Sequence, residues 1–348
     1  MSSRTNIVDF PPTGKIAELE SPHQDFDNPS LHLKPADPSS KNGISLALGG
    51  GAARGWAHIG VLRAIDEANI PVSMIAGTSI GALVGGCYLA GKLDELEEFA
   101  RSITRRNILR YMDFAFRASG LINGRRLADR MDCEIGELNI EDLNRRFIAI
   151  AADIRTGSEI WLEHGSLVQA IRASYALPGV FEPVQHFGKL LVDGAILNPV
   201  PVSACRAYEQ KVVLAVNLNT EVFGRSAIVR STSINHKADG PLTGTEQDQT
   251  SWLSFARKSG DKEKEESSRL GLTGVMIEAF NIIQDKISRS RLAGDPPDFT
   301  IRPKLAEIGL SDFHKADAAI ELGYEVARIK LAALEESGLR EALAGHSS

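Results

Sequence analysis

Two glycine-rich stretches decide the fold: residues 44–60 read ISLALGGGAARGWAHIG, and residues 72–86 read VSMIAGTSIGALVGG. Each stretch begins with a short apolar run, passes through glycines and continues with apolar residues at helical spacing. A short apolar run bounded by turn residues is typical of a buried strand, and the spacing after it is typical of a helix. Strand, helix, strand, helix in this order predicts a parallel sheet with helices on its faces.

The chain beyond these stretches contains further segments that fit the same architecture. Residues 147–152 and 159–162 are expected to form a pair of strands, residues 299–301 predict another, and residues 190–192 and 212–216 are short apolar runs. Helices are expected at residues 93–106 and 275–287, followed by a final helix with one face formed by Leu322, Val326, Ile329 and Ala333.

We expect the folded domain at residues 43–334. Polar segments lie before it, after it and within it. Residues 1–42 contain six prolines and no apolar periodicity, which predicts a disordered leader. Residues 224–270 are polar and end in a mixed charge run at 262–266, which predicts a solvated, partly mobile insertion. Residues 335–348 are expected to form a frayed C-terminal tail.

The composition is that of an ordinary folded protein. Of the 348 residues, 43% are apolar and 24% are charged, and the net charge is −6. An acidic chain is a poor match for nucleic acid as a bulk partner. Cys87, Cys133 and Cys205 have no metal-like spacing and cannot all pair, so we expect reduced thiols in a cytoplasmic protein. Residues 1–15 lack the apolar segment of a signal peptide, which agrees with that location.

One uncharged stretch, residues 68–91, is long enough to be considered as a membrane span. It also contains Gly81 and Gly85 at the spacing found in pairs of transmembrane helices. However, it includes a proline, two serines, a threonine and five glycines. These residues favour a short strand, a tight turn and a buried helix instead.

Ser79 lies in a G-x-S-x-G pattern, Gly77-Thr78-Ser79-Ile80-Gly81, at the junction of the second strand and its helix. A serine on such a sharp turn has a strained backbone, and the two glycines avoid collisions with neighbouring residues. The hydroxyl is then exposed above the sheet edge, over a helix N-terminus that favours developing negative charge. This makes Ser79 a candidate nucleophile. The alternative interpretation is a helix N-cap serine beside two packing glycines.

The glycine loop at residues 49–55 follows the first strand directly. Consecutive glycines allow backbone N–H groups to point into a shared concavity, which can hold an oxyanion or a phosphate. Neither register of the loop gives the dinucleotide pattern G-x-G-x-x-G, because Arg54 or Ala52 stands where a glycine is needed, and no Gly-Lys-Ser/Thr of a P-loop follows. Arg54 could steady the loop or meet an anionic head group, and the alternative is a surface salt bridge.

Asp193, followed by Gly194 and Ala195, lies at the end of an apolar run, where aspartate commonly forms a turn. It gains interest beside Ser79, because a serine nucleophile needs a base. Histidine is the usual base. In the order Ser, Asp, His, only His236 and His314 follow Asp193 outside the tail, and neither lies in a motif.

Together these motifs resemble the patatin-like phospholipase family, and its bacterial members in particular. Residues 49–62 resemble the oxyanion motif of the family, residues 77–86 its nucleophile elbow, and Asp193-Gly194-Ala195 its catalytic Asp-Gly turn. Residues 170–179 and 193–201 also fit the bacterial members. The similarity extends over about residues 43–219, with weaker echoes at residues 312–327.

The resemblance implies a three-layer α/β/α fold with a mainly parallel sheet, and a serine acyl hydrolase of the phospholipase A or lysophospholipase type with no metal or other cofactor. It implies a dyad of Ser79 as nucleophile and Asp193 as base, without histidine. It assigns oxyanion or substrate binding to Gly49, Gly50, Gly51, Ala52, Arg54 and Gly55, the elbow to Gly77 and Gly81, and the Asp-Gly turn to Gly194. Many relatives have glycine where this chain has Ala52, which keeps its N–H donor but makes a positive φ unfavourable.

The sequence says less about the substrate and about contact with a membrane. Residues 103–127 interleave arginines with aromatic and aliphatic residues, which suits contact with anionic lipid at a membrane surface or, equally, a lid helix that buries its aromatics. The expected substrate is a lipid or other acyl ester: phospholipid, lysophospholipid, thioester or short ester. The alternative function is a catalytically weak regulatory or lipid-binding scaffold that keeps the fold.

Overall fold

The computed structural model describes residues 43–104, 135–208, 212–219 and 272–336, together with Leu339 and Leu343. The expected leader at residues 1–42, the expected insertion at residues 224–270 and residues 105–127 of the arginine-rich stretch lie outside these ranges. Most of the expected tail lies outside them as well.

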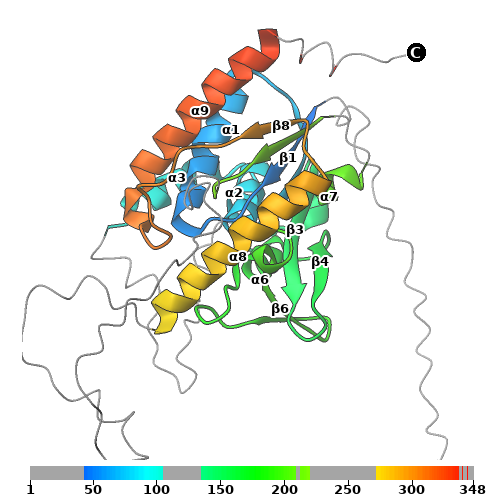
Figure 1. Ribbon diagram of the computed structural model, residues 1–348. Coiled ribbons are helices and arrows are strands. Elements are labelled where there is room, and N and C mark those ends of the chain that lie inside the picture. The colour runs from blue at the N-terminus through cyan, green and yellow to red at the C-terminus, as the bar shows by residue number, and fades with distance from the viewer. Residues whose placement is uncertain are drawn as a thin grey trace, which may run out of the picture. The chain divides into compact units, whose positions relative to one another are not determined.

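Five strands that pair in parallel form the centre of the fold (Figure 1). Their order in the sheet is β3 (Arg146–Asp153), β2 (Val72–Thr78), β1 (Ile44–Leu48), β7 (Val213–Val216) and β8 (Phe299–Ile301). Every residue of β1, β2 and β7 is buried. Parallel strands covered on both faces have such continuous apolar sequences, as the first two stretches predicted.

Three antiparallel strands extend the sheet beyond its parallel part. β4 (Ser158–Leu162) pairs with residues 149–153 of β3, while β6 (Lys189–Asp193) pairs with β3 and with β5 (Val184–His186). On β3, residues 146–150 pair with β2 and residues 151–153 pair with β6. Since β4 overlaps both segments, β2 and β6 share the opposite edge of β3 and meet there end to end.

Helices cover both faces of this sheet. The α-helices are α1 (Ala57–Glu67), α2 (Ile80–Leu89), α3 (Leu93–Ser102), α6 (Leu167–Tyr175), α7 (Val202–Arg206), α8 (Leu272–Gly294) and α9 (Ala316–Glu336). Short 3₁₀ helices are η2 (Ala52–Trp56), η3 (Ile140–Asp142), η4 (Gly194–Ile196) and η6 (Phe313–Lys315).

Two apolar cores lie on the two faces of the sheet. Leu46 and Leu48 of β1 belong to the larger core, which includes side chains of α1, α2, α3, α6 and α9. Ala47, between them, points to the other face and belongs to a smaller core with residues of α7, against which Leu292 of α8 packs. The expected three-layer α/β/α fold with a mainly parallel sheet is confirmed.

Helices α1 and α9 pack so closely that their backbones touch. A Cβ atom added at Gly60 would lie 1.9 Å from the Ile320 carbonyl oxygen, and one at Gly323 would lie 2.1 Å from that of Ala57. The buried face of α9 is therefore formed largely by small residues such as Ala319, Gly323 and Ala327. Ile329, on the face that the sequence marked as apolar, is 63% exposed.

The uncharged stretch at residues 68–91 contains β2 and α2, both packed in the core. Within the described part of the chain, no helix has both the length and the apolar content needed to cross a bilayer.

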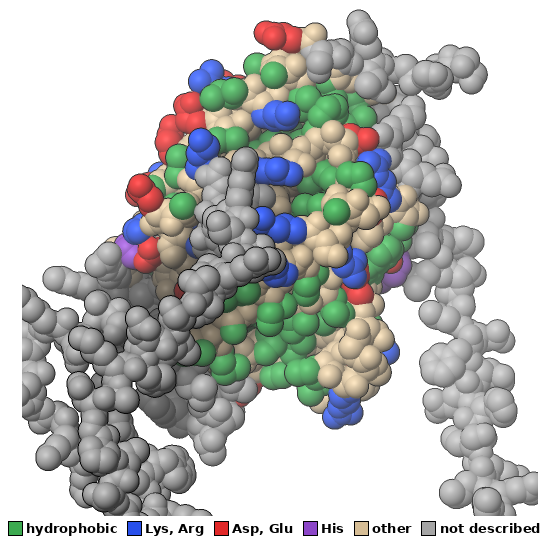
Figure 2. Space-filling view, viewed as in Figure 1, with side chains coloured by type: hydrophobic (Ala, Val, Ile, Leu, Met, Phe, Trp, Pro, Cys, Tyr) green, Lys and Arg blue, Asp and Glu red, His purple; other side chains and the backbone are tan. Residues whose placement is uncertain are grey.

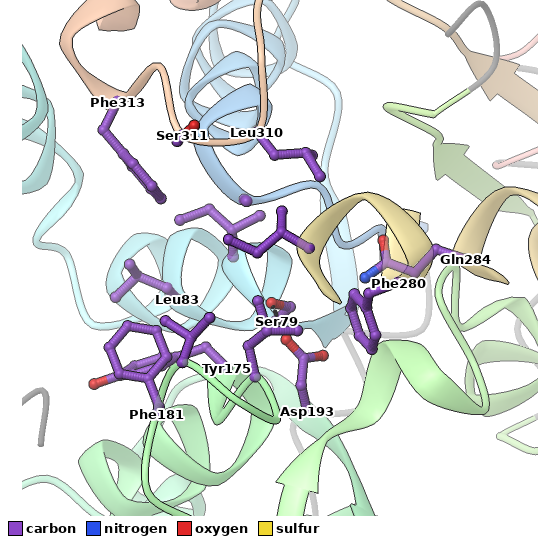
Figure 3. A pocket seen from close by; sticks show the side chains of 15 residues that line it. Ser79, Leu83, Tyr175, Phe181, Asp193, Phe280, Gln284, Leu310, Ser311 and Phe313 are labelled. Atoms are coloured by element: carbon purple, nitrogen blue, oxygen red, sulfur yellow. Dashed lines mark hydrogen bonds between the residues drawn. The ribbon is translucent and has the colours of Figure 1, made fainter. Parts of the chain in front are cut away.

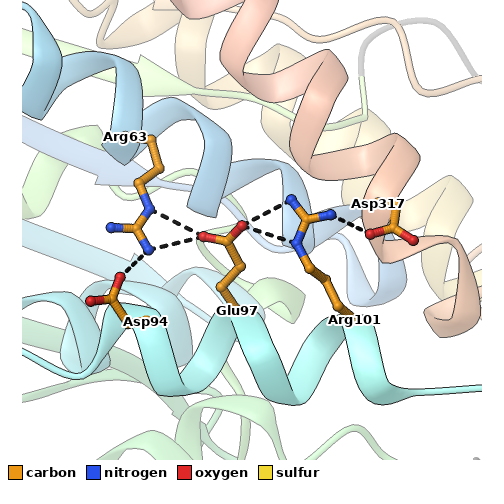
Figure 4. Close-up of polar contacts among 5 residues, drawn as sticks. All are labelled: Arg63, Asp94, Glu97, Arg101 and Asp317. Atoms are coloured by element: carbon orange, nitrogen blue, oxygen red, sulfur yellow. Dashed lines mark hydrogen bonds and ion pairs between the residues drawn. The ribbon is translucent and has the colours of Figure 1, made fainter.

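A network of five charged side chains joins α1, α3 and α9 on the surface (Figure 4). Glu97 of α3 lies at its centre, 2.9 Å from Arg63 Nη2 of α1 and 2.9 Å from Arg101 Nη2 of its own helix. Arg63 also pairs with Asp94, and Arg101 with Asp317 of α9. The Glu97 side chain is only 20% exposed, whereas that of Asp94 is 83% exposed.

We expect Glu97→Gln to lower the free energy of unfolding by about 1 kcal/mol, because it removes the acceptor charge that two arginines share. Asp94→Asn is the matched control and should lose less than about 0.5 kcal/mol, since its carboxylate is solvated. Urea denaturation at low and high salt measures both variants, and the difference should shrink as salt screens the charges. Equal losses would show that Glu97 has no special role in joining the helices.

Candidate active site

Ser79 stands at the sharp turn between β2 and α2. Its φ of 58° lies in the left-handed region, which a residue with a side chain rarely adopts. Gly81 makes the turn possible, because a Cβ atom there would lie 2.2 Å from the Leu48 carbonyl oxygen. A Cβ atom at Gly77 would lie 2.6 Å from the backbone of Ala82. Both glycines of the pattern are therefore required by close backbone approach.

Three hydrogen bonds hold this strained turn in place. The Ser79 N–H donates to Ser174 Oγ at 2.9 Å, and Ser174 Oγ donates to the Ile150 carbonyl oxygen of β3 at 2.6 Å. Thr78 Oγ1 donates to the Asn198 carbonyl oxygen at 2.8 Å. The sequence pattern gave no role to Ser174, because its contact depends on how α6 packs beside β2 and β3.

Asp193 lies next to Ser79, where the sheet register brings the end of β6 to the end of β2. Ser79 Oγ donates to Asp193 Oδ2 at 2.6 Å, and the Ala195 N–H donates to Asp193 Oδ1 at 2.8 Å (Figure 3). Burial raises the pKa of the Asp193 carboxyl to about 7, although the hydrogen bonds from Ser79 and Ala195 oppose the shift. A Cβ atom at Gly194 would lie 2.3 Å from the Ile150 carbonyl oxygen, so the following residue must be glycine.

The glycine loop follows β1 and passes beside Ser79, but not all of its N–H groups are available. The Gly49 N–H donates to the Val216 carbonyl oxygen at 3.1 Å, and the Gly50 N–H donates to that of Pro199 at 2.9 Å. The N–H groups of Gly49 and Gly50, which the resemblance assigned to oxyanion or substrate binding, are therefore not free donors. Among the described residues, the N–H groups of Gly51 and Ala52 have no acceptor.

Ala52 adopts the conformation that its side chain disfavours, with φ of 48°. It occupies the first position of η2 and lines the pocket together with Ser79. The Ala52 N–H group is therefore available to an oxyanion, although the backbone at this position is strained.

Neither Arg54 nor Gly55 lines the pocket. Both instead pack behind the glycine loop. Arg54 is 3% exposed, and its Nε donates to the Ile308 carbonyl oxygen at 2.7 Å, so it is not a surface salt bridge. Burial lowers the pKa of the Arg54 guanidinium. A Cβ atom at Gly55 would lie 2.1 Å from the Ile80 side chain, which shows how closely η2 packs on α2.

His58 is fully buried and acts on the glycine loop instead of on Ser79. Its Nε2 lies 2.7 Å from the Gly49 carbonyl oxygen, and burial lowers the pKa of the ring to about 4. The ring is thus neutral near pH 7, with its proton on Nε2 because a carbonyl oxygen only accepts. Among the residues that the structure describes, Asp193 is the sole hydrogen-bond partner of Ser79 Oγ. His236 lies outside that part of the chain.

An apolar pocket opens beside Ser79 and Asp193. Its walls come from α2, from the end of α6 and residues 177–181 after it, from α8, and from residues 310–313 at the start of η6 (Figure 3). Apolar side chains dominate the lining, among them Leu83, Leu177, Val180, Phe181, Phe280 and Phe313. The described ranges contain no group of three or more His, Cys, Asp or Glu side chains that could hold a metal ion.

Comparison with known proteins places the chain in a family. A family model described as patatin-like phospholipase matches residues 46–206, which include the glycine loop, Ser79 and Asp193. An uncharacterised NTE family protein of Mycobacterium tuberculosis is 33% identical over 336 residues, which cover 85% of this chain and 93% of that protein. The chain belongs to the patatin-like phospholipase family.

Other patatin-like relatives are much longer proteins. Neuropathy target esterase sws of Drosophila melanogaster is 32% identical over 187 residues, which are 52% of this chain and 13% of the relative. Patatin-like phospholipase domain-containing protein 6 of Mus musculus is 32% identical over 188 residues, which are 52% of this chain and 14% of the relative.

The crystal structure of VipD from Legionella pneumophila aligns with a TM-score of 0.44 and 12% identity, over 84% of this chain and 67% of that one. Family membership supports a lipid acyl hydrolase in general.

The raised pKa of Asp193 implies that the stability of the folded protein depends on pH. The folded protein holds the Asp193 proton more tightly than the unfolded chain does, so this group's contribution to stability is present below about pH 4 and is lost as pH rises through 7. Asp193→Asn cannot ionise, and it should therefore increase the free energy of unfolding at pH 8 by at least about 1 kcal/mol.

Urea denaturation of both proteins at pH 5 and pH 8 measures this effect, and the gain should be larger at pH 8. Asp153→Asn is the control at the end of β3, because hydrogen bonds from Arg155 and Thr156 lower the pKa of Asp153. That variant should lose stability at neutral pH. A loss of stability in Asp193→Asn at pH 8 would contradict the conclusion that burial of the ionised Asp193 carboxylate destabilises the folded protein.

Proposed function

We propose that this patatin-like protein hydrolyses fatty-acyl esters of lipids through Ser79, Asp193 and an acyl-enzyme. The observation that supports this most strongly is the 2.6 Å hydrogen bond from Ser79 Oγ to Asp193 Oδ2, because both residues line the apolar pocket. A hydroxyl that donates to a carboxylate can pass its proton to that carboxylate as the oxygen attacks a carbonyl carbon.

In the first half-reaction, Ser79 Oγ attacks the ester carbonyl carbon and its proton moves to Asp193. The N–H groups of Gly51 and Ala52, together with the N-terminus of α2, stabilise the negative charge on the carbonyl oxygen. The tetrahedral intermediate then breaks its bond to the alcohol, which leaves with the proton from Asp193. In the second half-reaction, Asp193 takes a proton from the water that attacks the acyl-enzyme and returns it to Ser79 Oγ as the fatty acid leaves.

The environment of Asp193 supports its role as the base. An ordinary aspartate, with a pKa near 4, is a weak base at neutral pH. Burial raises the pKa of Asp193 to about 7, which matches its proton affinity to the working pH without a histidine. The neutral, loop-bound His58 leaves this role to the carboxylate.

The surface around the pocket supports a lipid substrate taken from a membrane. Val275, Met276, Ile282 and Ile283 of α8 are between 41% and 50% exposed, while Ile277 and Phe280 of the same helix line the pocket. In Figure 2, charged side chains of both signs gather over α9. Peripheral contact with a lipid surface is part of the proposal. The free, buried thiols Cys87 and Cys205 suit the proposed cytoplasmic location.

Ser79→Ala should abolish hydrolysis of p-nitrophenyl octanoate and labelling by a fluorophosphonate probe, because both require the serine oxygen. Ser174→Ala is a useful companion, since it loosens the turn without removing the nucleophile, and it should slow hydrolysis about tenfold or more while labelling persists. Labelling that survives in Ser79→Ala would exclude Ser79 as the nucleophile. A wild-type protein that neither hydrolyses esters nor reacts with the probe would favour the lipid-binding scaffold.

The pH dependence of kcat/KM tests the base separately. We expect kcat/KM to rise with pH and to level off with an apparent pKa near 7, because Asp193 accepts a proton only when ionised. His58→Gln keeps a side-chain donor near the Gly49 carbonyl oxygen and should leave that apparent pKa unchanged. A profile that loses its pH dependence in His58→Gln would assign the titration to the histidine.

A further inference from the structure

Gln284 is a polar side chain in an otherwise apolar wall of the pocket. It lies on α8, only 5% exposed, and lines the cavity with Ile277 and Phe280 of the same helix. The family match ends at residue 206, so this wall comes from a part of the chain outside the matched catalytic region.

The orientation of the Gln284 amide follows from a chain of hydrogen bonds that begins at a backbone carbonyl. Asn219 Nδ2 lies 3.5 Å from the Gly50 carbonyl oxygen, which can only accept, so the nitrogen of the Asn219 amide must face it. The same nitrogen donates to Gln284 Oε1 at 3.3 Å. With its oxygen engaged, Gln284 turns its Nε2 group away from Asn219.

The Nε2 group of Gln284 is consequently a donor directed at the pocket. No acceptor for it is found among the residues that the structure describes, although Gln284 is nearly buried. Figure 3 shows Gln284 and Phe280 on one side of Ser79 and Asp193, with Leu83, Tyr175 and Phe181 on the other side. The pocket thus has a side of mainly aromatic and aliphatic side chains and a side where Asn219 holds a hydrogen-bond donor, and Ser79 lies between them.

We propose that Gln284 determines specificity for the alcohol part of the substrate. The apolar side of the pocket takes the acyl chain, and Gln284 Nε2 donates a hydrogen bond to an oxygen carried by the leaving alcohol. The favoured substrates are esters of alcohols that carry a further hydroxyl or phosphate oxygen, as glycerol derivatives do. This inference rests on the proposed ester hydrolysis at Ser79.

The size of the effect follows from the shape of the site. A donor held in an apolar pocket loses its water when a substrate enters, and an alcohol without an oxygen leaves that donor unpaired. A site built around such a donor rejects the analogue that lacks the acceptor by at least about tenfold.

Two esters with the same acyl chain and a three-carbon alcohol test this inference directly. Glycerol 1-octanoate and propyl octanoate differ only in the two hydroxyl groups of the alcohol. The full-length wild-type protein should favour the glycerol ester in kcat/KM. Gln284→Met removes the donor at nearly constant volume and should lower the ratio of glycerol ester to propyl ester at least about tenfold. The loss should fall mainly on the glycerol ester.

The matched control is Asn281→Leu, which removes a buried amide one turn away on the same helix that does not line the pocket. It should leave the ratio unchanged. Asn219→Asp provides a second route to the same effect, because a carboxylate oxygen beside Gln284 draws the Nε2 group out of the pocket. This variant should also lower the ratio, whatever its effect on both rates together.

The outcomes are distinguishable from a failure of the proposed function. A ratio that stays at the wild-type value in both Gln284→Met and Asn219→Asp overturns the role of Gln284. Equal losses for both esters in Gln284→Met, with fluorophosphonate labelling intact, also overturn it, because the residue then serves the reaction or the fold and not the alcohol. Hydrolysis that survives Ser79→Ala contradicts the proposed function instead.

Discussion

The active site depends on the pairing register of β3. Two adjacent residues on one edge of this strand, Ile150 and Ala151, pair with Thr78 of β2 and Asp193 of β6. This pairing brings Ser79 and Asp193, which lie 114 positions apart in the chain, within hydrogen-bond distance. A slip of β6 by one residue would turn the aspartate to the other face of the sheet. The paired strands of the sheet therefore set the distance between Ser79 and Asp193.

The site concentrates features that oppose folding. Ser79 and Ala52 both have positive φ angles, and Asp193 is a carboxyl group buried in apolar surroundings. Each is held by specific neighbours: Ser174 accepts from the Ser79 N–H, and Ala195 donates to Asp193. Local strain of this kind persists only where the surrounding structure over-determines it, and it is common where a protein performs chemistry. The strands and helices around the site supply that support.

Much of this arrangement could be predicted from the sequence, because its determinants are local. The apolar runs marked β1, β2, β3 and β6, and the glycines around Ser79 marked the strained turn. The contacts of single groups could not be predicted, because they join distant segments. The Gly50 N–H is engaged by Pro199, Ser174 reaches Ser79 only when α6 is packed, and Arg54 turns inward to Ile308. The sequence pattern predicts the wrong buried face for α9, because Gly60 and Gly323 let the backbones of α1 and α9 touch and small residues form the contact.

The backbone of Asn198 and Pro199, shortly after Asp193, forms hydrogen bonds with several parts of the site. Thr78 donates to the Asn198 carbonyl oxygen, Gly50 donates to that of Pro199, and the Asn198 N–H donates to Gly194 beside the aspartate. The Ser79 turn, the glycine loop and the Asp193 turn are thus attached to one short segment. The site has fewer independent degrees of freedom than its separate elements suggest. A displacement of this segment would therefore shift the Ser79 turn, the glycine loop and the Asp193 turn together.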